Sequence, residues 1–360
     1  MVLIILPNFS AGGAERVTIN LANNLSYSKD VHLIVFNDYG PLRKHLSKNV
    51  VVHNLDKPSL RQSILLIIRL IKKLKPKVVF SSIGYINIAT ISIKTVFRYS
   101  FRTIIREANL PSISLKNNKA NFLFKFLYKK LYPKANLILA SSQRMKLEFI
   151  NDFNINNSHI NVINNPVDIK HIRKLAKEKI NHPAFNISKE IIFITAGRLT
   201  VQKNHKELID NFINLNKKNS RLLILGDGEL KMDLKNYIQL KQVSDKVILL
   251  GYVENPWAWF SIGDAFLLSS SWEGMPNAAL EALACGLPVI ATPNCGGLPD
   301  LTTELDKDSL TISKMGDEFI HAMKKVKKIN SFSSRKSLLP ELFDVHHFVK
   351  KIGHFYNDLL

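Results

Sequence analysis

Short apolar runs alternate with stretches of helical periodicity along the first half of the chain. The strand-like runs cover residues 2–6, 31–36, 50–55, 77–82, 102–107, 137–141 and 160–165. Apolar residues at helical spacing fill several of the gaps, at 15–25, 60–74 and 143–153. Strands that alternate with helices are typical of a mostly parallel sheet covered by helices on both faces. The pattern therefore predicts a doubly wound α/β unit.

The second half of the chain repeats this rhythm after a break. Residues 164–168 interrupt it, and a polar, helical stretch continues to about residue 188. Strand-like runs then return at 191–197, 221–226, 246–251, 265–270 and 288–292, with helical patterns at 205–219, 229–242, 255–262 and 276–285. We predict an N-terminal domain at 1–165 and a C-terminal domain at 166–340. A helix at 341–360 is expected to pack back on the N-terminal domain.

The charge of the chain is large and unevenly placed. Its formal net value is +21, and residues 1–165 contain 24 Lys and Arg against 7 Asp and Glu, whereas residues 166–360 contain 26 against 22. A basic field attracts nucleic acid, an anionic membrane or a phosphorylated substrate. A coding bias toward Lys, Asn and Ile explains the total equally well, but it explains the asymmetry less well.

Composition also bears on the cellular context. No uncharged apolar run approaches the ~18 residues that a membrane-spanning helix needs. The opening residues suggest a β-strand rather than a signal peptide, and the two cysteines, Cys285 and Cys295, suggest reduced thiols in a cytoplasmic protein. Residues 61–75 and 122–134 mix Lys and Arg with large apolar groups. Each suits an anionic membrane surface, although a core helix with a solvated basic face explains either one equally well.

Several βα turns carry groups that suit a phosphorylated ligand. Gly12 and Gly13 follow the first strand and begin a helix, which forms a concavity of backbone N–H groups, although a glycine pair alone is more often a tight turn. The spacing is not GxGxxG, so the dinucleotide-binding fingerprint is absent. Arg198 and Lys203 follow the first strand of the second domain and suit a diphosphate, although two ordinary surface cations explain them equally well.

Two glutamates interrupt the apolar segment 269–292. Pro276 suits a first helical turn, and the pattern predicts a helix over 277–284. Glu281 follows Glu273 by about two helical turns, so both carboxylates can face one ligand that presents hydroxyl pairs, such as a ribose or a hexose. A capping acid and a solvent-facing glutamate are the alternative interpretation.

The glycine pair at 12–13, the two cations at 198 and 203 and the two glutamates at 273 and 281 follow one another along the chain. This succession of motifs resembles that of the retaining GT-B glycosyltransferases of the family 4 grouping, which act on lipid and polysaccharide acceptors. The resemblance extends from the first strand to about residue 300. It implies two Rossmann-like domains that face each other across a cleft, with the acceptor on the basic N-terminal domain and a nucleotide sugar on the C-terminal domain. Arg198 and Lys203 would hold the donor diphosphate, Glu281 the ribose, and Glu273 would act at the donor sugar.

The same resemblance implies roles for the remaining candidates. Donor-binding roles fall to the Gly12-Gly13 loop over the diphosphate, to Tyr252, Val253 and Glu254 at the base, and to the backbone of Gly274, Met275, Pro276 and Asn277 behind Glu273. Such enzymes retain the anomeric configuration, since the acceptor hydroxyl attacks from the face that the diphosphate leaves. Cations and helix N–H groups neutralise the leaving phosphate, so neither a metal nor another cofactor is expected.

The sequence departs from the family pattern at three places. Arg106 and Glu107 stand where many members carry a His near the reacting sugar. This pair resembles a subgroup that transfers amino sugars or hexoses into bacterial glycans, which favours UDP over GDP and makes Glu107 a catalytic candidate with an open role. Asp300 replaces a frequent Glu, and residues 302–309 replace an Asn-Gly loop. Residues 306–308 match the Asp-x-Asp metal-binding signature in sequence, but they lie in a charged loop outside the strand pattern, and we expect them to be exposed.

We therefore expect a hexosyl- or N-acetylhexosaminyltransferase that uses a UDP-sugar and a glycan or polyprenyl-diphosphate-linked acceptor. It would serve cell-surface polysaccharide or lipopolysaccharide synthesis at the inner face of the cytoplasmic membrane. A non-hydrolysing sugar-nucleotide epimerase shares the architecture, but its catalytic carboxylates and His find no match here. A nucleic-acid-binding protein would explain the charge, but the sequence contains no recognised base-reading module or aromatic stacking platform.

Overall fold

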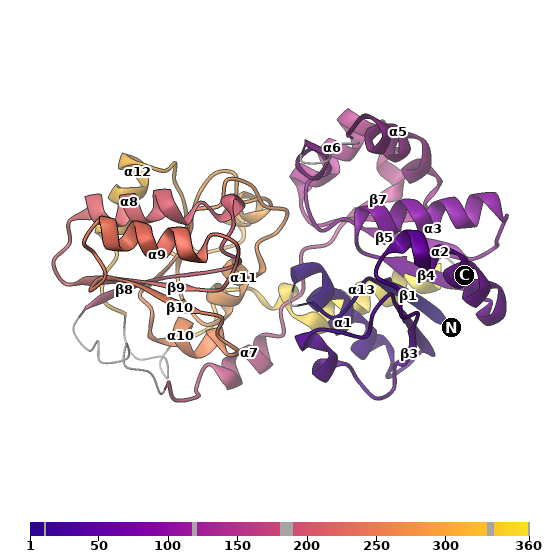
Figure 1. Cartoon of the computed structure of the whole chain (residues 1–360), viewed down its shortest axis with the longest axis horizontal. Coiled ribbons are helices and arrows are strands. Elements are labelled where there is room, and N and C mark those ends of the chain that lie inside the picture. Colours follow the sequence, from indigo (N-terminus) through magenta and orange to yellow (C-terminus); the bar gives the residue numbers. More distant parts are fainter. Residues whose placement is uncertain (11, 117–120, 181–189, 330–334, 359–360) are drawn as a thin grey trace. The chain divides into compact units, whose positions relative to one another are not determined.

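The computed structural model describes residues 1–10, 12–116, 121–180, 190–329 and 335–358, and it divides the chain into two units. The first unit combines Met1–Pro166 with Val345–Leu360, and the second is Val167–Asp344. Each unit contains a parallel sheet with helices on both faces (Figure 1). The α/β fold class expected from the alternating pattern is confirmed.

The first unit is built on a seven-stranded sheet with the order β3-β2-β1-β4-β5-β6-β7. Its strands are β1 Val2–Leu6, β2 Val31–Val35, β3 Val51–Asn54, β4 Val78–Ser81, β5 Arg102–Arg106, β6 Leu137–Ala140 and β7 Ile160–Val162. Its helices are α1 Gly13–Leu25, α2 Leu60–Leu74, α3 Gly84–Val96, α4 Pro111–Lys116, α5 Asn121–Leu131, α6 Gln143–Phe153 and α13 Val345–Asp358. Every paired strand runs parallel to its neighbour.

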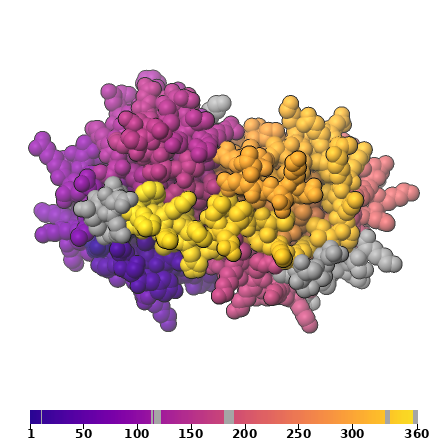
Figure 2. Space-filling model, turned by 180° about the vertical axis from the view of Figure 1, so that it is seen from behind, coloured from indigo at the N-terminus to yellow at the C-terminus, as the bar shows by residue number. Residues whose placement is uncertain are grey.

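Alternation along each strand divides the core of this unit between two faces of the sheet. In β1, Val2, Ile4 and Leu6 pack with α1 and α13, whereas Leu3 and Ile5 pack with α2 and α3. Helices α5 and α6 cover the same face as α2 and α3, at the β5–β7 end of the sheet. Figure 2 shows the C-terminal segment in yellow beside the indigo N-terminal segment, in agreement with the packing of α13 against α1.

The second unit is built on a six-stranded sheet with the order β10-β9-β8-β11-β12-β13. Its strands are β8 Ile191–Ala196, β9 Ser220–Leu225, β10 Val247–Gly251, β11 Ala265–Leu268, β12 Val289–Ala291 and β13 Leu310–Ile312. Its helices are α7 Ile169–Leu175, α8 His205–Leu215, α9 Lys231–Leu240, α10 Pro256–Ile262, α11 Asn277–Ala284 and α12 Asp317–Lys325. Helices α7, α10 and α11 cover one face of this sheet, and α8, α9 and α12 cover the other.

Most predicted elements form within a few residues of their expected bounds, and the exceptions have local causes. The strand expected over 160–165 ends at Val162, because the chain turns out of the sheet toward the junction of the two units. Helix α3 was not predicted, because it buries apolar residues around most of its circumference and leaves little periodicity to detect. Part of the polar stretch expected to reach residue 188 lies outside the described residues, and its described part contains α7.

Candidate active site

Both sheets reverse their winding direction along the strand order. In the first unit the strand order changes direction between β1 and β4, and in the second between β8 and β11. In open α/β sheets, ligands bind beyond the carboxyl ends of the strands at this switch point. The segments that follow β8 and β11 contain Lys203 and Glu273, respectively. The geometry therefore favours a ligand site here in the second unit.

Glu273 is buried and held by three side chains. Its side chain is 8% exposed, and Oε1 lies 2.5 Å from the Lys203 ammonium nitrogen. The Ser270 hydroxyl donates to the same oxygen over 2.7 Å, and the Gln202 amide lies 3.4 Å from Oε2. A buried carboxylate is strongly destabilising unless charges and hydrogen bonds compensate it. The buried acid expected from the sequence therefore has its cation, and that cation is Lys203.

Close backbone contacts shape the loop that carries Arg198 and Lys203. A Cβ added to Gly226, whose φ is +137°, would lie 1.9 Å from the Gly197 carbonyl oxygen. A Cβ on Gly228 would lie 2.5 Å from the Leu199 carbonyl oxygen. These glycines let the turn after β9 pack directly under the loop, which leaves Arg198 exposed at its rim.

A second glycine turn supports the start of α11. Gly296 has a φ of +71°, and a Cβ there would lie 2.0 Å from the Gly274 carbonyl oxygen. The Gly297 amide donates to that same oxygen over 2.9 Å. Helix α11 then begins at Asn277, as predicted, with Pro276 in the N-cap position. The turn thus fixes the segment containing Gly274, Met275 and Pro276, all of which are buried.

Glu281 lies in the second turn of α11. It contacts helix α10, whereas Glu273 contacts the loop after β8. The Trp257 indole N–H, from α10, donates to Glu281 Oε2 over 2.8 Å. Trp257 is itself buried, and the exposed His171 ring packs edge-on against it at 5.9 Å between centroids. Sequence reasoning missed Trp257, which is 24 residues from Glu281 and carries no local signal of the contact. This bond fixes the orientation of the Glu281 carboxylate.

The remaining donor-side candidates lie on the surface of the second unit. Tyr252 is 62% exposed and follows β10 through Gly251, which has a φ of +73°. Glu254 is exposed and Val253 is half-buried. The acidic pair at 306–308 is exposed, as expected. Within the described parts of the chain, no group of three or more His, Cys, Asp or Glu side chains is placed to hold a metal ion.

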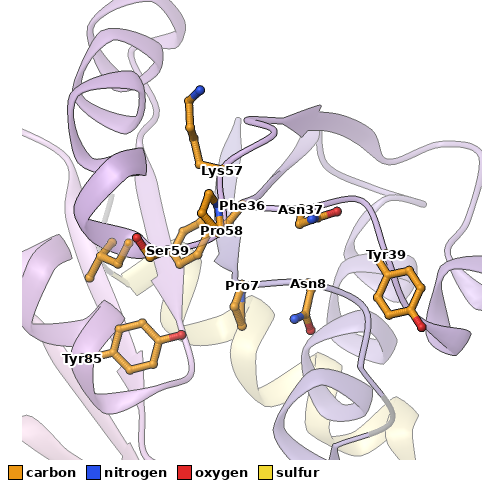
Figure 3. Close-up of a pocket in the computed structure, with 10 residues that line it drawn as sticks. Pro7, Asn8, Phe36, Asn37, Tyr39, Lys57, Pro58, Ser59 and Tyr85 are labelled. Carbon is orange, nitrogen blue, oxygen red and sulfur yellow. The ribbon is translucent and has the colours of Figure 1, made fainter.

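The switch point of the first unit opens into a cavity of about 500 Å³. Its walls come from the segments after β1, β2 and β3 and from the first turn of α3 (Figure 3). Tyr85 and Tyr39 lie on opposite sides of Pro7 and Asn8, while the Lys57 side chain projects away from them (Figure 3). Aromatic rings with a few polar groups suit a sugar-sized ligand.

The predicted glycine loop lies beside this cavity. Gly12 caps α1, and Gly13 is its first residue. The Glu15 carboxylate folds back so closely that a Cβ on Gly12 would lie 2.1 Å from Glu15 Oε2. Burial, with a smaller effect from the Glu15 carboxylate, raises the pKa of the Tyr85 hydroxyl, so the cavity wall and the first turn of α1 are electrostatic neighbours.

Glu107 lies at the end of β5 and is 3% exposed. Its Oε1 accepts hydrogen bonds from Tyr128 and Asn87, each over 3.0 Å, and from the Tyr132 hydroxyl. Burial raises the pKa of this carboxyl to about 7 despite these donors. The catalytic role expected for Glu107 stays a prediction, and sequence reasoning missed both tyrosines.

The two parallel sheets with helices on both faces are a GT-B architecture, and comparison with known proteins gives its family. Residues 177–338 match the model for "Glycosyl transferases group 1", and residues 11–171 match that for "Glycosyltransferase Family 4". The chain belongs to the GT-B glycosyltransferases of the family 4 grouping, and it is a glycosyltransferase.

Two curated relatives come from Campylobacter jejuni. One is "N-acetylgalactosamine-N,N'-diacetylbacillosaminyl-diphospho-undecaprenol 4-alpha-N-acetylgalactosaminyltransferase", 32% identical over 83% of this chain and 82% of that protein. The other is "GalNAc-alpha-(1->4)-GalNAc-alpha-(1->3)-diNAcBac-PP-undecaprenol alpha-1,4-N-acetyl-D-galactosaminyltransferase", 26% identical over 93% and 90%. Among solved structures, Anabaena HepE in complex with UDP-glucose aligns with a TM-score of 0.79, at 18% identity over 99% of both chains. The similarity to HepE shows a shared fold and nothing further.

Proposed function

We propose that the protein transfers an N-acetylhexosamine or hexose from a UDP-sugar to a polyprenyl-diphosphate-linked glycan, with retention of configuration. The observation that carries this proposal is the Lys203–Glu273 pair at the switch point of the second sheet, with Glu281 in the second turn of the α11 helix that follows. The relatives' names support the acceptor class and favour N-acetylgalactosamine as the first sugar to test.

The donor diphosphate would lie against Arg198 and Lys203. Lys203 carries three N–H donors, so it can hold Glu273 and a phosphate oxygen together. The exposed Arg198 adds a fork that matches phosphate geometry. Negative charge grows on the leaving phosphate in the transition state, and cations placed there in advance lower the barrier. The leaving oxygen can then accept the proton of the acceptor hydroxyl.

The two carboxylates would hold the sugar parts of the donor. Glu281, oriented by Trp257, offers acceptor lone pairs to the two ribose hydroxyls. Glu273 stands at the donor sugar, with Gly274, Met275, Pro276 and Asn277 behind it. The base would lie on the exposed segment containing Tyr252, Val253 and Glu254, and the Gly12-Gly13 loop would close over the diphosphate.

A panel of nucleotide sugars read by thermal shift tests donor binding. We expect UDP-N-acetylgalactosamine or another UDP-sugar to raise the melting temperature of the wild type, and to raise that of Glu281→Ala and Arg198→Ala less. A shift with GDP-sugars alone would contradict the UDP assignment, and no shift with any donor would contradict the site. An epimerised product from a UDP-sugar without acceptor would favour the sugar-nucleotide epimerase instead.

We also propose that the first unit docks on the inner face of the cytoplasmic membrane. Helix α5 exposes Phe122 by 87% and Phe126 by 50%, and neither α5 nor α2 carries an acidic residue. Leu65 of α2 is 65% exposed, on the same side of the sheet. Apolar groups among lysines suit anionic lipid. Within the described residues, no helix is long and apolar enough to cross a bilayer.

Vesicle flotation tests this surface. Vesicles with one third phosphatidylglycerol should carry the wild type at low salt and release it at high salt. Replacing Lys125, Lys129 and Lys130 with Ser should weaken binding, whereas the same change at the second unit's Lys206, Lys231 and Lys235 should not. Equal loss in both triple variants, or no binding by the wild type, would contradict docking through α5.

A further inference from the structure

A buried polar cluster ties α5 to the first turn of α3. The Tyr128 hydroxyl, from α5, and the Asn87 amide, from α3, both donate to Glu107 Oε1 over 3.0 Å. Asn87 also donates to the Arg106 carbonyl oxygen and accepts from the Ser81 hydroxyl over 2.6 Å. Tyr128 is 2% exposed and Asn87 is fully buried. Buried and satisfied networks of this kind fix the relative position of the elements they join.

Gly84 brings the cluster into direct contact with the start of α3. A Cβ added there would lie 2.2 Å from the Tyr128 hydroxyl oxygen and 3.3 Å from Glu107 Oε1. No ordinary side chain fits in this space, so the first turn of α3 rests on the hydroxyl itself. The next residue is Tyr85, whose ring lines the cavity of the first unit (Figure 3).

We propose that Glu107 and Tyr128 are positioning residues that set the place of Tyr85 in the acceptor cavity. This inference rests on the proposed function, and it takes the cavity of the first unit as the place that receives the glycan end of the acceptor. Tyr85 is 39% exposed, and its ring can stack on a sugar face. Glu107 acts through the hydroxyl of Tyr128 and through Asn87, and it does not touch the substrate.

The contacts around Glu107 favour this role over acid–base catalysis. A catalytic acid or base must come within hydrogen-bond reach of the proton it moves. Glu107 is instead 3% exposed, and two tyrosine hydroxyls and an amide converge on its Oε1. An uncharged group with the same acceptor oxygen preserves these bonds, so a glutamine should serve in its place.

Kinetics with UDP-N-acetylgalactosamine and an undecaprenyl-diphosphate-linked disaccharide ending in N-acetylgalactosamine test the inference. Gly84→Ala, which forces a methyl group against the Tyr128 hydroxyl, should raise the acceptor KM about fivefold or more and leave the donor KM within about twofold. Tyr128→Phe should raise the acceptor KM less. The acceptor KM of the double variant Gly84→Ala/Tyr128→Phe should be close to that of Tyr128→Phe alone. Without the hydroxyl, the nearest ring atom, Cζ, lies 3.4 Å from the new Cβ.

Substitutions at Glu107 give the matching control. Glu107→Gln should keep kcat and the acceptor KM within about twofold, and Glu107→Leu should raise the acceptor KM about tenfold. Loss of kcat in Glu107→Gln with an unchanged acceptor KM would overturn the inference in favour of a catalytic group. An unchanged acceptor KM in Gly84→Ala and Tyr128→Phe would also overturn it.

Amide hydrogen exchange separates a failure of this inference from a failure of the proposed function. Exchange at residues 85–88 should accelerate in Tyr128→Phe and Glu107→Leu, but not in α11, whether or not the disaccharide is the right acceptor. No transfer by the wild type would refute the proposed acceptor alone. Unchanged exchange in both variants would refute the positioning role alone.

Discussion

Lys203 has one task in the structure, as the partner of Glu273, and a second in the proposed function, at the donor diphosphate. Its ammonium lies 2.5 Å from the buried Glu273 carboxylate, and its loop also carries the exposed Arg198. Removing one partner of a buried pair leaves the other charge uncompensated, whereas removing an exposed cation does little to folding. The two cations of the expected diphosphate site should therefore differ sharply in their effect on stability.

Replacing each cation with Ala tests this difference. Lys203→Ala should lower the free energy of unfolding by about 3 kcal/mol, and Arg198→Ala by less than about 0.5 kcal/mol, in denaturant unfolding without ligand. Lys203→Ala/Glu273→Gln should recover part of the loss, because it removes the unpaired charge as well. Equal stability of both single variants would show that Glu273 does not depend on Lys203.

His205, the first residue of α8, should make the second unit sensitive to acid. The side chain is 3% exposed, and Nδ1 finds no hydrogen-bond partner among the described residues. Burial, with a smaller effect from Lys203, lowers the pKa of His205 to about 4. Between this value and the ordinary 6.5, the unfolded chain binds the proton and the folded chain does not, so stability falls as pH falls.

Acidification should therefore separate wild type from His205→Gln. Between pH 7 and pH 5 the wild type should lose about 2 kcal/mol more unfolding free energy than the variant, measured by urea unfolding. The comparison removes the contributions of groups that titrate in both proteins. Parallel losses would indicate that His205 is protonated in the folded state at pH 5.

The turn after β12 and helix α11 act as one element. Gly296 has a left-handed backbone conformation, and a Cβ added to it would lie 2.0 Å from the Gly274 carbonyl oxygen, so the turn fixes the segment that leads into α11. In contrast, among the described residues no atom outside the backbone of α13 itself lies within 4 Å of a Cβ added to Gly353, and its φ is not in the left-handed region. The same chemical change should have opposite effects at these two glycines.

Native-state hydrogen exchange can follow this contrast in each unit separately. Gly296→Ala should destabilise the second unit by about 2 kcal/mol or more and weaken donor binding, because backbone must move. Gly353→Ala should stabilise the first unit by about 0.5 kcal/mol through better helix propensity. If Gly296→Ala left exchange in α11 unchanged, the turn would not support that helix.

The sequence predicts the elements of the molecule better than its long-range contacts. Periodicity and the Pro and Gly signals gave the bounds of α11, and they identified Glu273 as a buried acid that needs a partner. The partners themselves come from distant segments. Trp257 reaches Glu281 from 24 residues away, and Tyr128 reaches Glu107 from 21. Such pairings arise only when the sheets bring their strand ends together.

Across the whole molecule, each sheet has a candidate ligand-binding feature near its own switch point. The second unit contributes the Lys203–Glu273 pair, and the first contributes a cavity bounded by Tyr85. The excess of Lys and Arg over Asp and Glu in residues 1–165 lies on the unit with that cavity. This division suits a donor site on one unit and an anionic, lipid-linked acceptor on the other.

Sugar transfer itself tests this account most directly. The full chain would be incubated with UDP-N-acetylgalactosamine labelled in the sugar and with an undecaprenyl-diphosphate-linked disaccharide ending in N-acetylgalactosamine, and the lipid fraction would be analysed by NMR. We expect the label in a lipid-linked trisaccharide with a new α-glycosidic bond, and about a hundredfold less product with Glu281→Ala. A β-linked product would contradict retention, and an unlabelled lipid fraction with every UDP-sugar would contradict the proposed function.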